Sequence, residues 1–285
     1  MDVRRIVVIG AGTMGAGIAQ VGAQAGCRVR LCDVSDEMIE RGMTTIRRML
    51  DKGIERGKVT EAQRDETLAR VGTSTDMRAA AADVDLAVEA VPEQMQLKQQ
   101  IFRALDEACP PGAFLASNTS SLSIDEIASV TGRPERVVGM HFFNPVPIMK
   151  LLELVRGERT SEETIAAAQA LGERMGKTTI TVRNAPGFAT SRLGLVLGLE
   201  AIRMVEQGVA SAADIDTAMT LGYAHPMGPL RLTDLVGLDV RLSIAESLHE
   251  RLQSEAFRPP ELLRRMVAEG KLGKKTGHGF YDWND

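Results

Sequence analysis

The feature that most constrains this chain is a glycine-rich segment placed directly after its first apolar run. Ile6 to Ile9 leads into Gly10-Ala11-Gly12-Thr13-Met14-Gly15, a helical pattern of small residues follows, and a second apolar run ends on Asp33. This order predicts a strand, a tight turn, a helix and a second strand with an acid at its end. In such a unit the first glycine permits the turn, the second lets the backbone approach a pyrophosphate, and the third lets the helix pack closely on the strand.

The same unit predicts which small molecule the chain binds. Unpaired N–H groups and the positive end of the helix dipole attract phosphates at the start of the helix. Asp33 can accept hydrogen bonds from a ribose diol and would repel a 2′-phosphate, and no arginine follows it directly. The expected cofactor is therefore NAD rather than NADP.

Composition argues against several other classes of protein. The chain has 285 residues, of which 44% are hydrophobic and 25% charged, and its formal net charge is −4. These values are ordinary for a globular protein of about two domains, and they disfavour binding to nucleic acid or to a membrane surface. We expect no transmembrane helix and no signal peptide, because the apolar runs are short. The three scattered cysteines predict reduced thiols in a cytoplasmic protein, with no metal site.

The chain divides into two halves of different character. Up to about Asn184, strand-like and helix-like segments alternate, which predicts a doubly wound sheet with helices on both faces. A helical hairpin over 36–70 interrupts this alternation. From Pro186 onward the strand signal disappears, and a Pro-Gly pair marks the boundary. We expect a Rossmann-type NAD-binding domain over 1–185 and an all-α domain over 186–285 that serves substrate binding and assembly of a homodimer. The expected elements are strands over 85–91, 113–117, 136–143, 150–155 and 178–182, and helices over 94–109, from 123, and over 161–176, 215–221, 233–252 and 260–269.

The most informative segment after the glycine turn is Met140-His141-Phe142-Phe143-Asn144-Pro145-Val146-Pro147. Its two prolines favour a turn, so the β-rich runs on either side can return beside one another and bring His141 to Glu153. A carboxylate next to a histidine orients the ring, fixes its tautomer and stabilises the imidazolium, which makes the pair a general base at neutral pH. The alternative is a structural histidine and a glutamate that faces solvent.

From Ile6 to Trp283 the chain resembles the short, single-function L-3-hydroxyacyl-CoA dehydrogenases, which include the 3-hydroxybutyryl-CoA dehydrogenases. The resemblance rests on GAGTMGAGIAQ, EAVPE, SNTSSLSI, HFFNPVPIMKLLELV, APGF, HPMGPLRLTDLVGLD and KKTGHGFYDW, in that order. It implies an NAD-dependent enzyme of fatty-acid metabolism that interconverts an L-3-hydroxyacyl-CoA and a 3-ketoacyl-CoA.

The resemblance also implies roles for individual residues. His141 takes the proton of the 3-hydroxyl group, and Glu153 is its partner. Ser120 and Asn144 surround the substrate oxygen and the nicotinamide end of the cofactor. With Glu93 and Lys98 near the cofactor ribose and phosphates, the expected NAD contacts are Gly10, Gly12, Thr13, Met14, Gly15, Asp33, Ala90, Glu93, Lys98, Ser120, Asn144 and the tail residue Lys275.

Two further features concern the acyl-CoA substrate. Ser191 stands where the family usually has asparagine. Its hydroxyl is shorter than the amide and has fewer hydrogen-bond donors to offer near the substrate. Arg48, Lys52 and Arg56 recur at every fourth residue and form a basic stripe that can hold the phosphates of coenzyme A. The alternative is a solvated helix face paired with Asp51 and Glu55.

Three other functions are compatible with parts of the sequence. One is an NAD-dependent dehydrogenase of a free sugar acid, as in the L-gulonate 3-dehydrogenase and lambda-crystallin branch. Another is a β-hydroxyacid dehydrogenase that uses lysine as its acid–base group, which the His141 and Glu153 pair disfavours. The third is a dinucleotide-binding structural protein without turnover, which the intact set of polar residues disfavours.

Overall fold

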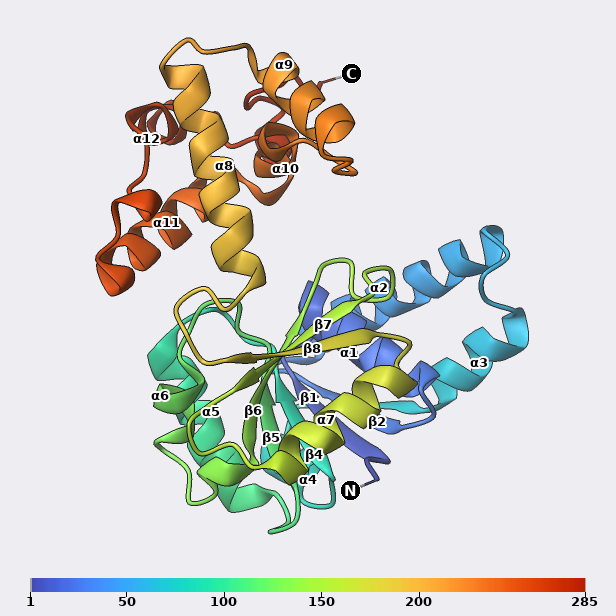
Figure 1. Ribbon diagram of the computed structural model, residues 1–285. Coiled ribbons are helices and arrows are strands. Elements are labelled where there is room, and N and C mark those ends of the chain that lie inside the picture. The colour runs from blue at the N-terminus through green and yellow to red at the C-terminus, as the bar shows by residue number, and fades with distance from the viewer. Residues whose placement is uncertain (1, 285) are drawn as a thin grey trace. The chain divides into compact units, whose positions relative to one another are not determined.

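An eight-stranded sheet forms the centre of the first of two compact units in the computed structural model, which describes residues 2–284 (Figure 1). The first unit ends at Ala185 and the second begins at Pro186. The expected boundary at the Pro-Gly pair lies at this division. The strands are β1 (Arg5–Ile9), β2 (Arg28–Cys32), β3 (Val71–Ser74), β4 (Leu86–Glu89), β5 (Phe114–Ser117), β6 (Val137–Phe142), β7 (Leu151–Arg156) and β8 (Thr178–Arg183).

The strand order is β3-β2-β1-β4-β5-β6-β7-β8. Every neighbouring pair is parallel except β6 and β7, which are antiparallel. The order reverses between β1 and β4, and in open sheets of this kind ligands bind beyond the carboxyl ends of the strands at such a reversal. Strands β4, β5 and β6 are buried along their whole length because helices cover both faces, and their polar residues lie toward the carboxyl ends of the strands.

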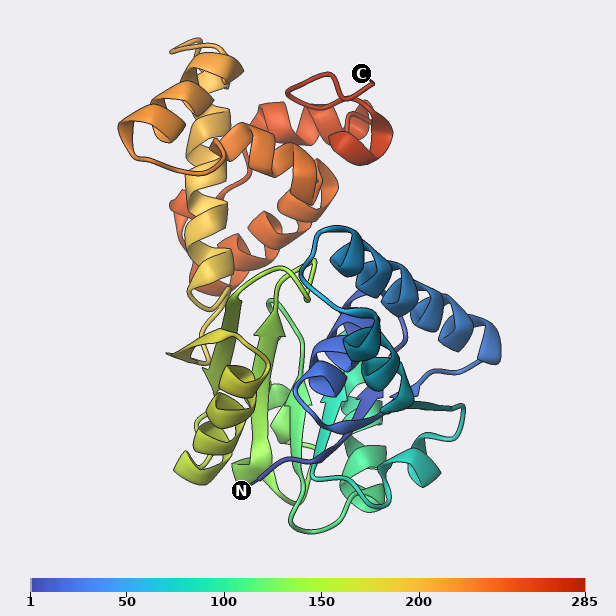
Figure 2. The ribbon, with the colours of Figure 1, turned by 90° about the vertical axis from the view of Figure 1, so that its right-hand side faces the viewer.

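Helices lie on both faces of this sheet (Figures 1 and 2). On one face, buried side chains of α1, α2 and α7 share a single apolar core with the sheet. Helices α4, α5 and α6 cover the other face. The bounds are α1 (Thr13–Gln24), α2 (Asp36–Glu55), α3 (Glu61–Ala69), α4 (Met77–Ala81), α5 (Met95–Ala108), α6 (Ile124–Ala128) and α7 (Glu162–Arg174). The expected doubly wound α/β architecture is confirmed.

Side-chain caps set the ends of the helical hairpin formed by α2 and α3. Ser35 accepts a hydrogen bond from the backbone N–H of Met38 at the start of α2. Thr60 and Gln63 form a reciprocal capping box at the start of α3. Ser123 caps α6 through the N–H of Glu126, as the sequence predicts. Strand β3 and helix α4 are additions to the expected elements; β3 is a short polar edge strand without a strong apolar pattern.

The regular elements among the described residues of the second unit are helices, as expected, with two isolated β-bridges in the tail. Its helices are α8 (Thr190–Glu206), α9 (Ala212–Thr217), α10 (Pro229–Val236), α11 (Leu238–Leu252) and α12 (Glu261–Ala268). One expectation is corrected here: the helix predicted over 233–252 is two helices. Gly237 separates them with a backbone φ of 102°, a left-handed conformation that interrupts α-helical geometry. Residues 218–222 form a π-helical turn after α9, so the segment predicted as one helix over 215–221 changes its winding partway.

The buried carboxylate of Asp234 holds the C-terminal tail through three hydrogen bonds, and that of Asp216 accepts one more from the hydroxyl of Tyr281. Asp234, which is 1% exposed, accepts hydrogen bonds from the backbone N–H groups of Phe280 and Tyr281 and from the indole nitrogen of Trp283, each at 2.9 Å. The guanidinium of Arg231 stacks on the Trp283 ring, 4.9 Å from its centroid. Within residues 2–284, no helix is both long and apolar enough to span a membrane.

We expect Asp234→Ala to loosen this tail, because three partly buried donors would lose their acceptor. The variant should lose about 2–3 kcal/mol of stability and shift the fluorescence of Trp283, the only tryptophan, to longer wavelength. Chemical denaturation followed by tryptophan emission measures both effects. Asp282→Ala, which removes an exposed carboxylate from the same tail, is the control. Equal behaviour of the two variants would contradict an anchoring role for Asp234.

Candidate active site

A pocket of about 700 Å³ lies at the carboxyl ends of the first four strands of the sheet order, beside the strand reversal. Of the expected dinucleotide contacts it contains Gly10, Gly12, Thr13, Met14, Asp33 and Ala90, whereas Gly15, Glu93, Lys98 and Ser120 do not line it. The lining residues are Ile9, Gly10, Gly12, Thr13, Met14, Cys32, Asp33, Val34, Met38, Thr75, Met77, Ala90, Val91, Pro92, Leu97 and Ile101. This lining is largely apolar, with one carboxylate and no lysine or arginine, so it suits an adenosine without a 2′-phosphate.

The three glycines of the turn meet different constraints. Gly10 has a φ of 101°, and a Cβ on it would lie 2.6 Å from the carbonyl oxygen of Ala90. A Cβ on Gly15 would lie 1.7 Å from the carbonyl oxygen of Gly10, so α1 can approach β1 only without a side chain there. Gly12 differs because nothing lies within 4 Å of its Cβ position. That open space at the start of α1 is where a dinucleotide pyrophosphate fits.

Asp33 is attached to the glycine turn as well as facing the pocket. Its carboxylate accepts hydrogen bonds from the backbone N–H of Ala11 at 2.6 Å and of Val34 at 2.7 Å. These bonds fix the carboxylate at the end of β2. The position fits the expected ribose contact, since a carboxylate oxygen can accept more than one hydrogen bond.

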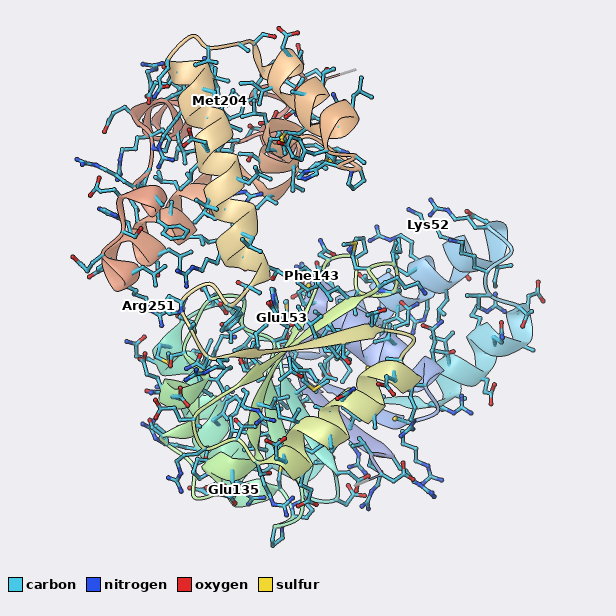
Figure 3. The ribbon with its side chains drawn as sticks, in the orientation of Figure 1. Lys52, Glu135, Phe143, Glu153, Met204 and Arg251 are labelled. Carbon is cyan, nitrogen blue, oxygen red and sulfur yellow. The ribbon has the colours of Figure 1, made fainter. Side chains whose placement is uncertain are left out.

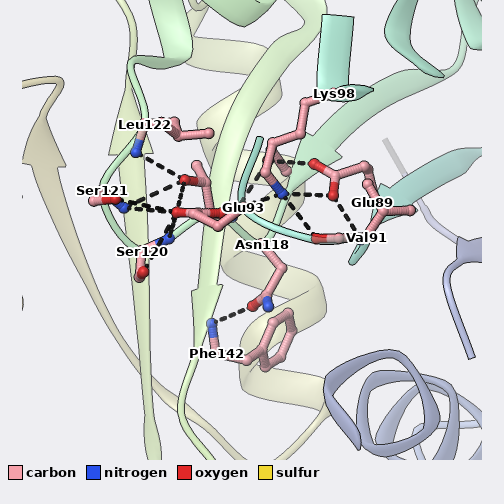
Figure 4. Close-up of polar contacts among 11 residues, drawn as sticks. Glu89, Val91, Glu93, Lys98, Asn118, Ser120, Ser121, Leu122 and Phe142 are labelled. Atoms are coloured by element: carbon pink, nitrogen blue, oxygen red, sulfur yellow. Dashed lines mark hydrogen bonds and ion pairs between the residues drawn. The ribbon is translucent and has the colours of Figure 1, made fainter. Parts of the chain in front are cut away.

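A buried ion-pair network lies next to this pocket (Figure 4). Lys98 of α5 is 1% exposed, and its ammonium lies 2.6 Å from Glu89, 3.3 Å from Glu93 and 3.3 Å from the carbonyl oxygen of Val91. The resemblance implies a place for Lys98 near the cofactor ribose and phosphates, and in the structure its ammonium contacts Glu89, Glu93 and Val91. The structure connects Lys98 to the pocket through Val91, which lines it, and through Glu93.

Glu93 organises the turn that carries Ser120. One of its carboxylate oxygens accepts hydrogen bonds from the hydroxyl of Thr119 at 2.6 Å and from the N–H groups of Ser120 and Ser121 at 3.0 and 3.2 Å. Burial by itself would raise the pKa of Glu93. The charge of Lys98 and these hydrogen bonds outweigh burial, and the pKa of Glu93 is lowered. Glu93 is therefore an anion that holds the serine turn in place at neutral pH.

His141 and Glu153 meet in the sheet, at the antiparallel pair of strands. They are directly opposite in the register of β6 and β7, and Nδ1 of His141 lies 2.8 Å from Oε2 of Glu153. The histidine is 7% exposed and the glutamate fully buried. The ring of Phe143 lies 4.4 Å from the imidazole, centroid to centroid, and Figure 3 shows Phe143 and Glu153 near the same end of the sheet. This geometry agrees with the expected acid–base pair and not with a glutamate that faces solvent.

Asn144 is exposed and begins the turn that leaves β6. The turn is fastened from beneath by Lys177, whose ammonium donates to the carbonyl oxygens of Val146 and Met149, the latter at 2.8 Å. Burial, with a smaller effect of Lys150, lowers the pKa of Lys177. Val146 itself packs against Gly17 of α1, where a Cβ would approach within 2.7 Å. Asn144 therefore projects from an anchored turn.

The basic stripe lies on the exposed side of the α2 hairpin, where Figure 3 shows Lys52. No side chain of this stripe (Arg48, Lys52 and Arg56) forms an ion pair or hydrogen bond with another residue in the range 2–284. The acids nearby have other partners: Asp51 pairs with Arg64, and Glu40 with Arg47. The structure therefore does not show the alternative in which the stripe is paired with Asp51 and Glu55.

The remaining expected site residues lie in the second unit. Ser191 is in the first turn of α8. Lys275, in the tail, forms an ion pair with Asp239 at the start of α11, with 2.6 Å between its Nζ and one carboxylate oxygen.

Sequence reasoning missed several residues that shape the site. Glu89 and Lys177 are buried and charged, and Asn118 accepts a hydrogen bond from the N–H of Phe142 at 2.9 Å, beside His141 (Figure 4). Charged residues inside an apolar strand were the available signal for Glu89. For the other two, only the folded chain reveals the partner. Among residues 2–284 no group of three or more potential metal ligands is assembled.

A dinucleotide pocket at the strand reversal, beside a buried histidine–carboxylate pair, defines a nicotinamide-dependent oxidoreductase with its own acid–base group. Comparison with known proteins is consistent with this class. Residues 5–185 match the family model described as 3-hydroxyacyl-CoA dehydrogenase, NAD binding domain, and residues 187–283 match the C-terminal domain of the same family. The chain belongs to the 3-hydroxyacyl-CoA dehydrogenase family.

Individual relatives cover the whole chain. A protein of Bacillus subtilis named "Probable 3-hydroxybutyryl-CoA dehydrogenase" is 49% identical over 285 residues, which is 100% of this chain and 99% of the relative. A 3-hydroxybutyryl-CoA dehydrogenase of Mycobacterium tuberculosis is 43% identical and covers 99% of both chains. The crystal structure of (S)-3-hydroxybutyryl-CoA dehydrogenase from Ralstonia eutropha superimposes with a TM-score of 0.96 at 43% identity and covers 100% of both chains.

The glycine geometry predicts opposite defects for two alanine variants. Gly12→Ala should keep the stability of the protein, because its Cβ meets no protein atom, but should weaken NADH binding at least tenfold by filling the pyrophosphate space. Gly15→Ala should lose about 1–3 kcal/mol of stability or more, because α1 must move away from β1. Thermal denaturation and NADH titration separate the two. The assignment is wrong if Gly12→Ala binds NADH normally.

Proposed function

We propose that this protein is an NAD-dependent (S)-3-hydroxybutyryl-CoA dehydrogenase, which interconverts L-3-hydroxyacyl-CoA and 3-ketoacyl-CoA of short acyl chain. The observation that carries the proposal is the buried hydrogen bond between His141 and Glu153 beside the dinucleotide pocket. The names of the full-length relatives supply the substrate class. The two alternatives, a dehydrogenase of free acids and a non-catalytic binding protein, are distinguished by the activity test described below.

The acid–base work belongs to His141. Because Nδ1 faces Glu153, the proton is exchanged at Nε2, the second ring nitrogen. In the oxidation direction His141 takes the proton of the 3-hydroxyl group, and Glu153 stabilises the imidazolium that results. In the reduction direction the protonated ring polarises the ketone and returns the proton to the oxygen. Ser120 and Asn144, at the ends of anchored turns, orient that same oxygen.

When bound, NAD would supply the acceptor for the hydride of C3, and NADH would supply that hydride in the reverse direction. The residues that would hold it are Gly10, Gly12, Thr13, Met14 and Gly15 at the phosphates, Asp33 at the adenosine ribose and Ala90 in the pocket wall. Glu93 borders the site, and Lys98 acts on it through Glu93. Ser120, Asn144 and Lys275 complete the proposed cofactor set.

The substrate's coenzyme A moiety is a polyanion, and the unpaired stripe of Arg48, Lys52 and Arg56 suits its phosphates. Ser191 completes the proposed substrate contacts, with a hydroxyl in place of the amide usual in the family. We place the enzyme in the cytoplasm, in keeping with three free and buried cysteines.

We also propose a homodimer formed by the helical unit. Leu232, Leu235, Val236 and Val240 on α10 and α11 are each about 40% exposed, an unusual gathering of large apolar side chains on one segment. The molecular mass in solution, measured by sedimentation, tests this assembly.

The reaction is tested by following NADH absorbance with acetoacetyl-CoA, with free acetoacetate and with NADPH in place of NADH. We expect rapid loss of absorbance for the thioester and NADH, and little for the other two combinations. Activity on free hydroxy acids or sugar acids instead would favour the free-acid alternative. NADH binding without turnover of any acyl-CoA or acid would favour the non-catalytic alternative.

His141→Gln ties this activity to the proposed residues. The variant keeps a polar side chain of similar size but cannot accept a proton, so turnover should fall by about 10²- to 10⁴-fold. NADH affinity should stay within about threefold, because His141 does not line the dinucleotide pocket. Steady-state kinetics and NADH titration measure the two quantities, and near-normal turnover would remove His141 from the mechanism.

A further inference from the structure

Glu89, at the end of β4, is a fully buried carboxylate with no part in the chemistry described above. An isolated buried charge is strongly unfavourable, so a buried ionic group needs partners that compensate it. Glu89 has three, and they lead in different directions. One oxygen accepts from the Lys98 ammonium at 2.6 Å and from the N–H of Val91 at 2.7 Å, and the other accepts from the hydroxyl of Ser117 at 2.6 Å.

Two of these contacts lead to the serine turn by separate routes, and Figure 4 shows the one through Lys98 and Glu93. The first route runs from Glu89 to Lys98, from Lys98 to Glu93, and from Glu93 to the N–H of Ser120 at 3.0 Å. The second runs from Glu89 to the hydroxyl of Ser117, which in turn accepts from the N–H of Thr119 at 3.3 Å. The first route ends on Ser120 itself, and the second ends on its neighbour Thr119.

The third contact leads to the dinucleotide pocket. Val91 lines that pocket together with its neighbours Ala90 and Pro92, and its N–H is held by Glu89. Glu89 is thus the point at which the wall of the cofactor pocket and the serine turn are joined. Each connection is a hydrogen bond or ion pair inside one compact unit.

We propose that Glu89 is a positioning residue that fixes Ser120 relative to the cofactor pocket, acting through Lys98 and Glu93. This inference rests on the proposed function, in which Ser120 orients the substrate oxygen. Its energetic logic is that a buried ion pair adds little net stability compared with apolar side chains. A displacement of about 1 Å at a positioned group can cost about 100-fold in rate.

The test compares Glu89→Gln, Lys98→Met and the double variant with a matched control on the same helix. Asp106, on α5, pairs with Arg133 at 2.7 Å, and this pair is also largely shielded from solvent. Asp106→Asn therefore reports what the loss of a comparable ion pair does to stability alone. Each variant is examined for NADH affinity, for kcat and KM with acetoacetyl-CoA, and for amide hydrogen exchange of residues 117–122.

We expect Glu89→Gln and Lys98→Met each to lower kcat by about 10- to 100-fold, with NADH affinity within about threefold, and to speed amide exchange in 117–122. The double variant should recover part of kcat, because no buried charge is left without its partner. Asp106→Asn should lower the thermal midpoint without changing kcat or exchange in 117–122.

Two results would overturn the proposal. Unchanged exchange and kcat in Glu89→Gln would show a role in stability alone, and weakened NADH binding with normal kcat in Lys98→Met would show direct cofactor contact. The exchange measurement does not need a known substrate. If the unsubstituted protein fails to reduce acetoacetyl-CoA, the proposed function is wrong, and the exchange rates still decide whether Glu89 positions the serine turn.

Discussion

The geometry of the site depends on the reversal of chain direction between β6 and β7. This antiparallel pair places His141 opposite Glu153, so a catalytic pair is held by backbone hydrogen bonds of the sheet. The register is set by the other face of the same strands, where Met140 faces Leu154 and Phe142 faces Leu152, all at most 2% exposed. A slip of one residue in either strand would turn the polar side chain of that strand into the apolar core and move its core residues to the face of the acid–base pair. The packing of the core thus determines the acid–base pair.

The charged groups inside the first unit gather at one edge of the sheet. His141 with Glu153, and Glu89 with Lys98 and Glu93, all lie at or beyond strand ends that border the dinucleotide pocket or the turns beside it. Buried ion pairs contribute weakly to stability, because removing two charges from water offsets most of their attraction. Their value here is positional, since each carboxylate holds a turn or a ring that would otherwise have several conformations.

Local signals predicted the parts of the fold that local chemistry determines. The glycine turn was predicted because each of its glycines meets a steric limit or an open approach within the same strand–turn–helix unit. The start of α6 at Ser123 was predicted for the same reason, because its cap involves residues three apart in the sequence. The helix predicted over 233–252 failed at Gly237 because apolar periodicity continues on both sides of a residue whose backbone turns left-handed. Strand β3 was missed because an edge strand needs no apolar pattern.

The site was predictable only where partners lie close in sequence or share a register. Sequence spacing alone did not determine whether His141 and Glu153 are in contact. The antiparallel pairing of β6 and β7 brings them together. The direction of Lys98 could not be predicted, because its nearest acceptor, Glu89, belongs to a strand on whose interior a carboxylate is unexpected. Whether the basic stripe is neutralised by nearby acids also depends on residues outside it. Asp51 forms an ion pair with Arg64 of α3, and Glu40 forms one with Arg47. A chain of net charge −4 thereby leaves Arg48, Lys52 and Arg56 uncompensated on one exposed face. Exposed cations of this kind attract a polyanion over about one Debye length, and added salt weakens this attraction. The electrostatic interaction within the buried acid–base pair is screened far less.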